Sequence, residues 1–448
     1  MLLKFTVSNW KSFREPTSLS LVAGKEKQHA DHIQYLPNYK LGVLPISVIF
    51  GANAAGKSNL IKAIDFAVNQ IVSANFDSLQ ENTVDSFRLE REFTEKDSEF
   101  EFVFVVNEIL YRYAFSLTPK GAVSSEVLER FKKKRSLTIY SRNDDGIVSF
   151  EDDSLTEAAK NVLNNPIPQK LVLSYVVQRN VPGLEELLEI YRWFRFKVII
   201  LTPHSRLIRI NETILPQKKL SKVLSKLDTS VSKIGFIPVQ DPGRFLPSLE
   251  IENARRMLKS GSGSVLVVGD ENSFFKFEII DGEMVCQKMI SYHKNQFGED
   301  VAFELSENSD GTRRCLHLFP AFNNLVQFGA DCCYFIDELD RSLHTNILKQ
   351  LLASYLATRN QDTRSQLILT NHDVEQLDQN VLRRDEIWIA ERNATIGNTS
   401  LVSLDEYKYK EEKIRKDRVL AKLYLDGRIG GIPRLDYFAN LFDYADEE

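Results

Sequence analysis

The sequence has few cysteines, and none of them forms a paired motif. Its 448 residues include only Cys286, Cys315, Cys332 and Cys333, without C-x-x-C spacing. This argues against a disulfide framework and favours buried thiols in a reducing compartment. Apolar runs of about eighteen residues, the length of a membrane span, are also missing. The first residues alternate like a strand and do not resemble a leader peptide. We therefore expect a cytoplasmic protein without membrane contact.

A strong charge of either sign is absent as well. The formal net charge is -5, so the overall charge of the chain does not indicate nucleic-acid binding. The basic run 130–135 and the mixed-charge stretch 408–418 leave nucleic acid open as a partner, although solvated faces are the favoured interpretation. Internal repeats and sustained heptads are missing, which excludes a long coiled coil. A chain of this length is expected to fold into two or three lobes.

One stretch that is present has the pattern of a phosphate-binding loop. Residues 51–58 read Gly-Ala-Asn-Ala-Ala-Gly-Lys-Ser and fit G-x-x-x-x-G-K-[ST]. A buried-strand pattern, 44–50, precedes the loop, and apolar residues at helical spacing follow it, so a chance match in a turn is disfavoured. We expect Gly51 and Gly56 to let the backbone wrap around an anion, Lys57 to reach the phosphates of ATP, and Ser58 to bind Mg²⁺.

Two carboxylates and a histidine complete a Mg-nucleotide pattern further along the chain. Asp337 and Glu338 follow the short apolar run 332–336, so a central strand would end at them. Asp337 would bind Mg²⁺ and Glu338 would polarise the attacking water, unless both are solvated acids at a strand end. His372 ends the next apolar run and would contact the γ-phosphate or the water; a surface or capping histidine is the alternative.

The residues 309–314, Ser-Asp-Gly-Thr-Arg-Arg, resemble the signature loop of ABC-type ATPases. Together with the loop, the carboxylates and His372, they make the chain similar to the ABC-type ATPase heads of RecF, SMC and OLD proteins. The resemblance is closer to AAA ATP-binding proteins of bacterial anti-phage defence operons, such as PARIS and Septu ATPase subunits and RloA-like proteins. The stretches that carry it are 9–13, 100–113, 309–314, 336–344, 382–388 and 424–433.

The resemblance implies an α/β fold: an ABC-type P-loop ATPase head, with a mixed sheet lobe and a central parallel sheet, and a mostly helical insertion. We assign residues 1–140 and 291–448 to the two halves of the head and 141–290 to a mainly helical insertion, although 264–305 alternates like strand.

It also implies an ATP site shared by two copies of the chain. Asn53 and Asn59 would join the loop residues in one subunit, and Ser309 and Gly311 of the other subunit would cap the γ-phosphate. An ordinary helix cap at Ser309 is the alternative.

Two features depart from the typical pattern. His344 stands where an ABC protein has an aspartate that contacts the other subunit, so this contact cannot be assumed. Gln80 is the only candidate that we find for the glutamine that couples Mg²⁺ to the helical lobe, and its surroundings do not resemble a strand.

The sequence leaves three functions open. The favoured one is an ATP-hydrolysing sensor and scaffold of an anti-phage system, which responds to a phage-encoded trigger and controls an effector encoded beside it through ATP-dependent oligomerisation. The alternatives are a RecF- or SMC-like DNA clamp in repair and a small-molecule P-loop enzyme. Only about sixty residues follow Ile389, too few for an additional domain of ordinary size, so we expect no nuclease in this chain.

Overall fold

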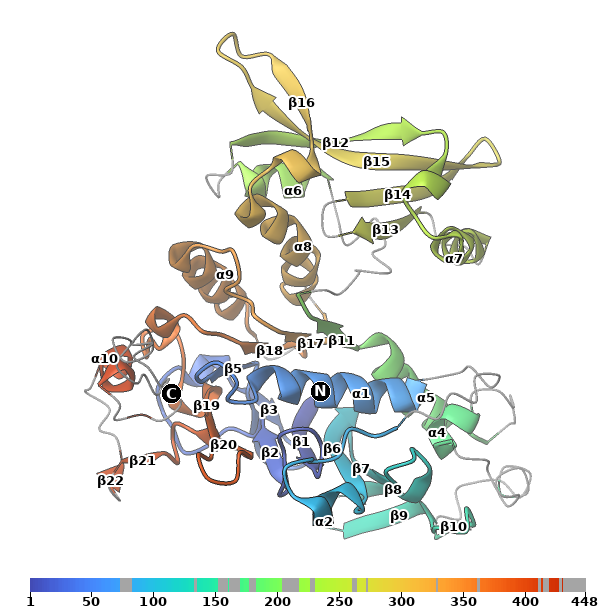
Figure 1. Cartoon of the computed structure of the whole chain (residues 1–448), viewed down its shortest axis with the longest axis vertical. Helices are drawn as coiled ribbons and strands as arrows, with labels where there is room; N and C mark the ends of the chain where they lie inside the picture. Colours follow the sequence, from blue (N-terminus) through green and yellow to red (C-terminus); the bar gives the residue numbers. More distant parts are fainter. Residues whose placement is uncertain are drawn as a thin grey trace, which may run out of the picture. The chain divides into compact units, whose positions relative to one another are not determined.

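The computed structural model describes the chain in segments. The described residues are 1–72, 83–132, 135–151, 160, 170–176, 183–203, 217–225, 230–259, 264–270, 273–327, 329–360, 363–409, 412–413, 419–426 and 429. They form two compact units, and Figure 1 gives their elements. We call residues 2–195 and 370–448 the loop unit, and residue 1 with 196–369 the carboxylate unit. Among the described residues, no helix has the length and apolar character needed to cross a bilayer.

The loop unit contains a seven-stranded antiparallel sheet in the order β10-β9-β8-β7-β6-β1-β2. Its strands are β1 (Leu2–Ser8), β2 (Thr17–Ser20), β6 (Ser98–Val106), β7 (Ile109–Leu117), β8 (Val123–Lys132), β9 (Arg135–Arg142) and β10 (Val148–Phe150). Figure 1 shows these strands in blue to cyan. The strand patterns of 2–8 with 16–23 and of 99–106 with 109–117 predict two hairpins, and both are confirmed as β1–β2 and β6–β7.

Aromatic side chains build the core of this sheet. Phe100, Phe102 and Phe104 alternate along β6 and are all buried, as expected for one face of a strand. Helix α5 (Glu185–Phe196) covers that face: the ring centroids of Phe104 and Trp193 lie 4.7 Å apart. Burial of such large rings supplies much of the stability of a sheet-and-helix layer.

The strand, loop and helix predicted around residues 51–58 are confirmed. Strand β5 (Ile46–Phe50) is fully buried, and α1 (Lys57–Val72) starts at the lysine of the loop. The predicted apolar positions of α1, from Leu60 to Val68, lie in the core, and so does Ile71. Strand β5 pairs in parallel with β19 (Ile387–Arg392), and β19 pairs antiparallel with β20 (Thr399–Ser403).

The remaining elements of the loop unit are short. They are η1 (Ala30–His32), β3 (Gln34–Leu36), β4 (Leu41–Val43), α2 (Arg91–Thr94), α4 (Val172–Val176), η5 (Val374–Gln376), η6 (Arg384–Glu386), β21 (Lys408–Tyr409), β22 (Glu412–Lys413) and α10 (Leu420–Leu425).

The carboxylate unit contains three parallel strands. Strand β17 (Cys333–Ile336) is flanked by β11 (Val198–Leu201) and β18 (Gln366–Thr370), so the predicted central position of the strand before Asp337 is confirmed. All four residues of β17 are buried. This agrees with their continuous apolar run, which is typical of a parallel strand whose two faces are both covered. Helix α8 (Asp310–Leu325) precedes β17 in the chain, and helix α9 (Thr345–Ala357) follows it.

An antiparallel sheet forms the other part of the carboxylate unit. Its order is β12-β15-β14-β13, and β16 pairs with β15. The elements are α6 (Gln217–Leu224), β12 (Val231–Val239), η3 (Pro242–Arg244), α7 (Ser248–Lys259), β13 (Ser264–Asp270), β14 (Ser273–Ile280), β15 (Glu283–Lys294), β16 (Asp300–Glu304) and η4 (Leu305–Glu307). In Figure 1, α8 connects this sheet with β17.

The expectation of a mainly helical segment at 141–290 was wrong for its second half. The patterns of 184–193 and 218–227 predict amphipathic helices, and α5 and α6 are found there, α6 as far as Leu224. In contrast, 231–239 and most of 264–290 are strands. Strand β12 was missed because Gly235 and Pro238 interrupt its alternation. Long-range pairing with β15 supplies the hydrogen bonds that the local pattern did not indicate.

Candidate functional site

The predicted site residues fall into two sets, one in each unit. The loop unit holds Gly51, Asn53, Gly56, Lys57, Ser58, Asn59 and His372, and the carboxylate unit holds Ser309, Gly311, Asp337 and Glu338. The candidate Gln80 lies outside the described residues. Each set has its own local geometry.

The ammonium group of Lys57 lies inside the loop that leads to α1. Its Nζ donates to the carbonyl oxygens of Gly51 at 2.6 Å and Ala52 at 3.0 Å, and the side chain is 4% exposed. Such a buried cation requires partners, because an uncompensated charge is costly away from water. Asn53 is exposed at the tip of the loop, and Ser58 and Asn59 are half-buried at the start of α1. The loop therefore combines a held cation with the N-terminus of a sixteen-residue helix, an arrangement suited to an anion.

His372 also lies at this loop, although it belongs to the second segment of the loop unit, residues 370–448. Its Nδ1 lies 3.3 Å from Nζ of Lys57, although 315 positions separate the two residues. The backbone that carries it is fixed, because the N–H of Asn371 donates to the carbonyl of Ile49 in β5 at 3.0 Å. The Asn371 side-chain oxygen accepts from the N–H of Asp373 at 2.8 Å. The imidazole is exposed, so it can reach a group bound at the loop.

A hydroxyl network that the sequence analysis missed supports the same loop. Thr399 Oγ1 donates to the carbonyl of Ala55 at 2.9 Å and lies 2.8 Å from Ser12 Oγ, a second hydrogen-bond partner. Asn59 Nδ2 donates to Ser12 Oγ at 2.9 Å, so the side chain of Asn59, a predicted binding residue, is held by Ser12. The approach is so close that a Cβ on Gly56, whose φ is +100°, would lie 2.1 Å from Thr399 Oγ1. Glycine is therefore required at this position.

A partial signal for this network was present in the sequence. Ser12 belongs to the stretch 9–13, which contributed to the family resemblance. Thr399 has no such signal, because it is one of several polar residues at the start of an ordinary strand. Only the fold shows that β20 passes beside the loop.

The two carboxylates follow β17 directly, as predicted. Asp337 is 3% exposed, and its N–H donates to the carbonyl of Leu201 at 2.8 Å. Glu338 is half-buried and has φ +50°, a left-handed backbone conformation that residues other than glycine seldom adopt. Backbone strain of this kind gathers at functional positions, where the surrounding structure maintains it.

Arg314 holds the backbone of this turn. Its Nη2 donates to the carbonyl oxygens of Glu338 at 2.9 Å and Asp337 at 3.4 Å. Burial lowers the pKa of the Arg314 guanidinium, and the charge of Arg341 lowers it further, while the carboxylates of Glu338, Asp340 and Asp337 oppose that change. The end of the predicted signature stretch and the predicted carboxylates thus form one packed group within the carboxylate unit.

The predicted signature serine lies at the start of α8. Ser309 is the N-cap: its Oγ accepts from the N–H of Thr312 at 3.2 Å, so the helix-cap alternative describes its local contact. Capping does not preclude a second role, because Ser309 and Asp310 are exposed. Gly311 packs against the turn after β17, where a Cβ would lie 2.9 Å from the carbonyl oxygen of Ser342.

His344 has a local role in this unit. It is the N-cap of α9, and its Nδ1 accepts from the N–H of Asn346 at 3.1 Å. Its exposed ring replaces the capping oxygen that an aspartate would offer at the same position.

Comparison with known proteins yields one family and one fold-level likeness. Residues 46–378 match the family described as "AAA domain, putative AbiEii toxin, Type IV TA system". No curated protein matches the sequence. Solved structures that match include the SMC head domain from Thermotoga maritima, at 13% identity and a TM-score of 0.35, covering 90% of this chain and 98% of that chain. Because the family match takes in well over half of the 448 residues, the chain belongs to this family of AAA domains.

Proposed function

We propose that the chain is a Mg²⁺-dependent ATPase. The contact between Lys57 and His372 carries this proposal, because it places an ammonium group and an imidazole together at one phosphate loop. Lys57 would bind the β- and γ-phosphates, with backbone N–H groups between Gly51 and Gly56 around them. Ser58 and Asp337 would bind Mg²⁺, and Glu338 would polarise the attacking water.

The hydrolytic role of Glu338 is supported by its backbone. A base must be aimed accurately, and the turn that carries Glu338 is held at its carbonyl by Arg314 while its φ is +50°. These contacts restrict the directions that the carboxylate can take. His372, which is exposed beside Lys57, would hydrogen-bond the γ-phosphate or the water.

The ATPase proposal is tested by phosphate release from the purified chain. With ATP and Mg²⁺ we expect steady phosphate release, and chelation of Mg²⁺ should stop it. Replacement of His372 by Ala should slow release, because it removes a group beside Lys57 and leaves the loop contacts of Thr399 and Ser12 in place. Nucleotide binding without any phosphate release would overturn the hydrolytic part of the proposal.

We further propose that two copies of the chain share each ATP. The exposed Ser309 and the start of α8 present a hydroxyl and free N–H groups, which suit the γ-phosphate bound by a second copy. Closed homodimers are the commonest symmetric assembly, and a shared ligand makes their formation depend on ATP.

In the cell, we propose, the chain is the sensor and scaffold of an anti-phage defence system whose effector is encoded by a neighbouring gene. The family match supports this, since its description refers to a toxin and a toxin–antitoxin system. Bacteria carrying the chain and its neighbour should resist phage, and deletion of either gene should remove resistance.

Light scattering of the chain with the neighbouring product, with and without ATP, separates the two main functions. A stable assembly that contains both proteins supports the defence role. A monomer that dimerises only with ATP, ignores the neighbour and binds DNA would instead indicate a repair clamp.

A further inference from the structure

We propose that His29, Asp31 and His32 form a binding site for one divalent transition-metal ion, of which Zn²⁺ is the best match. The three residues lie on and beside η1 in the loop unit. One potential ligand atom from each lies within 4.8 Å of the others. Nothing in the proposed ATPase chemistry uses them, so the site is a separate feature of the chain.

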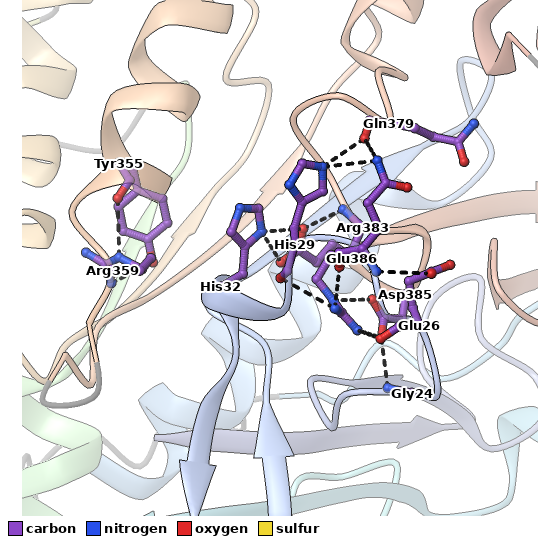
Figure 2. A network of polar contacts seen from close by, with 11 residues as sticks. Gly24, Glu26, His29, His32, Tyr355, Arg359, Gln379, Arg383, Asp385 and Glu386 are labelled. Carbon is purple, nitrogen blue, oxygen red and sulfur yellow. Dashed lines mark hydrogen bonds and ion pairs between the residues drawn. The ribbon is translucent and has the colours of Figure 1, made fainter. Parts of the chain in front are cut away.

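The hydrogen bonds behind both histidines determine which nitrogen is available. Nδ1 of His32 lies 3.1 Å and 3.3 Å from the two carboxylate oxygens of Glu386, so this nitrogen carries the proton. Nε2 of His29 lies 2.9 Å from the carbonyl oxygen of Gln379, which can only accept. In the neutral form of each ring, the other nitrogen, Nε2 of His32 and Nδ1 of His29, therefore keeps a lone pair for a metal. Figure 2 shows both rings beside these partners.

This arrangement is the usual support of a metal-binding histidine. Such a residue almost always donates its second N–H to a carboxylate or a backbone carbonyl, which fixes the ring and raises its basicity. Here His32 has the carboxylate and His29 has the carbonyl. His32 is 7% exposed and Glu386 is fully buried, so the pair cannot simply turn to solvent.

A rigid polar core lies beneath the turn. Arg383, fully buried, donates Nε and Nη2 to the two oxygens of Asp385 at 2.9 Å and 2.7 Å. Its Nη1 also donates to the carbonyl oxygen of Gln28 at 2.6 Å, directly before His29. Figure 2 shows these contacts joining the histidine turn to the segment 383–386. The ligands are thus presented by a backbone that is fixed on two sides, which lowers the ordering cost of binding.

Binding of a small ion requires a rearrangement of the exposed ligands. Zn–N bonds are about 2.0–2.1 Å, so two ligands of one tetrahedral ion lie about 3.4 Å apart. One ligand atom of each residue lies within 4.8 Å of the others, so the ligands must approach one another further. The two rings are stacked, with 13° between their planes and centroids 4.9 Å apart, so the His29 ring must rotate out of the stack before both lone pairs can meet at one ion. Asp31 is exposed and His29 is only half-buried, so both side chains can make this adjustment.

The donor set decides the class of ion. Two imidazoles and one carboxylate favour Zn²⁺ and neighbouring transition metals over Mg²⁺, which prefers oxygen ligands and retains water. Three protein ligands leave a fourth position open towards the solvent. The expected occupant is thus distinct from the Mg²⁺ of the ATPase proposal.

Isothermal titration of ZnCl₂ into the chelator-stripped full chain, without nucleotide and with excess Mg²⁺, tests the site. We expect one Zn²⁺ per chain and a rise of the melting temperature on binding. The loss of a hydrogen-bond partner behind a bound histidine lowers metal affinity about 10- to 100-fold. His29→Gln and Asp31→Asn remove a ligand, so each should lower the affinity at least about tenfold. His317→Gln, which changes a histidine in the carboxylate unit, is the matched control and should bind as the unaltered chain does.

The variants at His29 and Asp31 are chosen because both residues are accessible, so their replacement should leave folding intact. A circular dichroism spectrum checks this before titration. Absence of Zn²⁺ binding to the folded, unaltered chain would overturn the proposal. Equal affinity in His29→Gln, Asp31→Asn and the control would also overturn it, because the ion would then be bound elsewhere. Displacement of Zn²⁺ by excess Mg²⁺ would contradict the assigned donor set.

Discussion

The Nζ atom of Lys57 lies 3.3 Å from Nδ1 of His372, and the same ammonium donates to the carbonyl of Gly51 at 2.6 Å. One residue thus joins the start of α1, the loop before it and His372 of the segment 370–448. If phosphates replace these partners on binding, Lys57 exchanges contacts with neutral carbonyls for contacts with an anion, in which both partners are charged.

Replacement of Lys57 by alanine should abolish ATP binding. The loop then loses the only side-chain cation that the motif places on the phosphates. Fluorescence of a labelled ATP analogue measures this directly. Lys62→Ala is the matched control, because Lys62 is an exposed lysine on the same helix. If Lys57→Ala and Lys62→Ala bind the analogue equally well, the loop is not the nucleotide site.

Glu338→Gln should preserve ATP binding and reduce turnover by about 10²- to 10⁴-fold, the usual contribution of a positioned acid or base. The amide keeps the size of the side chain but cannot accept a proton from water. The variant should also accumulate as an ATP-bound dimer, since closure is no longer followed by hydrolysis. Phosphate release and light scattering measure the two effects. Unaltered turnover would remove the role that we assign to this carboxylate.

Ser309→Arg should block hydrolysis by crowding the γ-phosphate of the other subunit. A mixture with Lys57→Ala provides the sharper measurement. In a shared site, a dimer of the two variants contains one intact loop facing one intact Ser309, so mixing two inactive proteins should restore part of the activity. A mixture that stays as inactive as its components would show that Ser309 does not act across subunits. Circular dichroism controls for the lost helix cap, which is worth about 1 kcal/mol.

Glu126 should make the loop unit less stable as the pH rises. Its carboxyl is buried and accepts from the hydroxyls of Tyr113 and Tyr140, each at 2.7 Å. Burial raises the pKa of Glu126, and these hydrogen bonds oppose the rise only partly. A carboxyl with a raised folded-state pKa contributes stability below its unfolded pKa, near 4.5, and loses it as the pH rises through the folded pKa.

Glu126→Gln cannot ionise and should lack this dependence. Urea unfolding of both proteins between about pH 4 and 8 measures it, and the unaltered chain should lose stability relative to the variant as pH rises. A stability difference that stays constant over this range would contradict the prediction.

The four thiols should react slowly in the native protein. All are buried, and burial raises the pKa of Cys315 to about 11 and those of Cys286 and Cys332 to about 12; that of Cys333 is raised as well. The thiolate is the reactive form, so little of it exists at neutral pH. A colorimetric thiol reagent should label the unfolded chain rapidly and the folded chain only over the time of unfolding. Rapid labelling of a native thiol would indicate that one of them is accessible.

The sequence predicted those parts of the site whose residues are neighbours in the chain. Loop residues 51–58 lie between a buried strand and a helix, and Asp337 and Glu338 directly follow β17, because backbone hydrogen bonding makes each of these transitions local. Apolar periodicity likewise identified the hairpins β1–β2 and β6–β7. It failed at β12, where glycine and proline break the alternation and only pairing with β15 makes a strand.

By itself, then, the sequence determined where the loop motif and the two carboxylates lie and to which family the chain belongs, since these depend on residue types at fixed short spacing. Tertiary structure alone decided that Thr399 and Ser12 brace the loop, that Arg314 holds the carbonyl of Glu338, and that Glu386 orients His32. Each of these pairs joins segments far apart in the chain. The polarity of the two side chains does not indicate that they are partners. The distance between them is set only when the strands pair and the core forms around them.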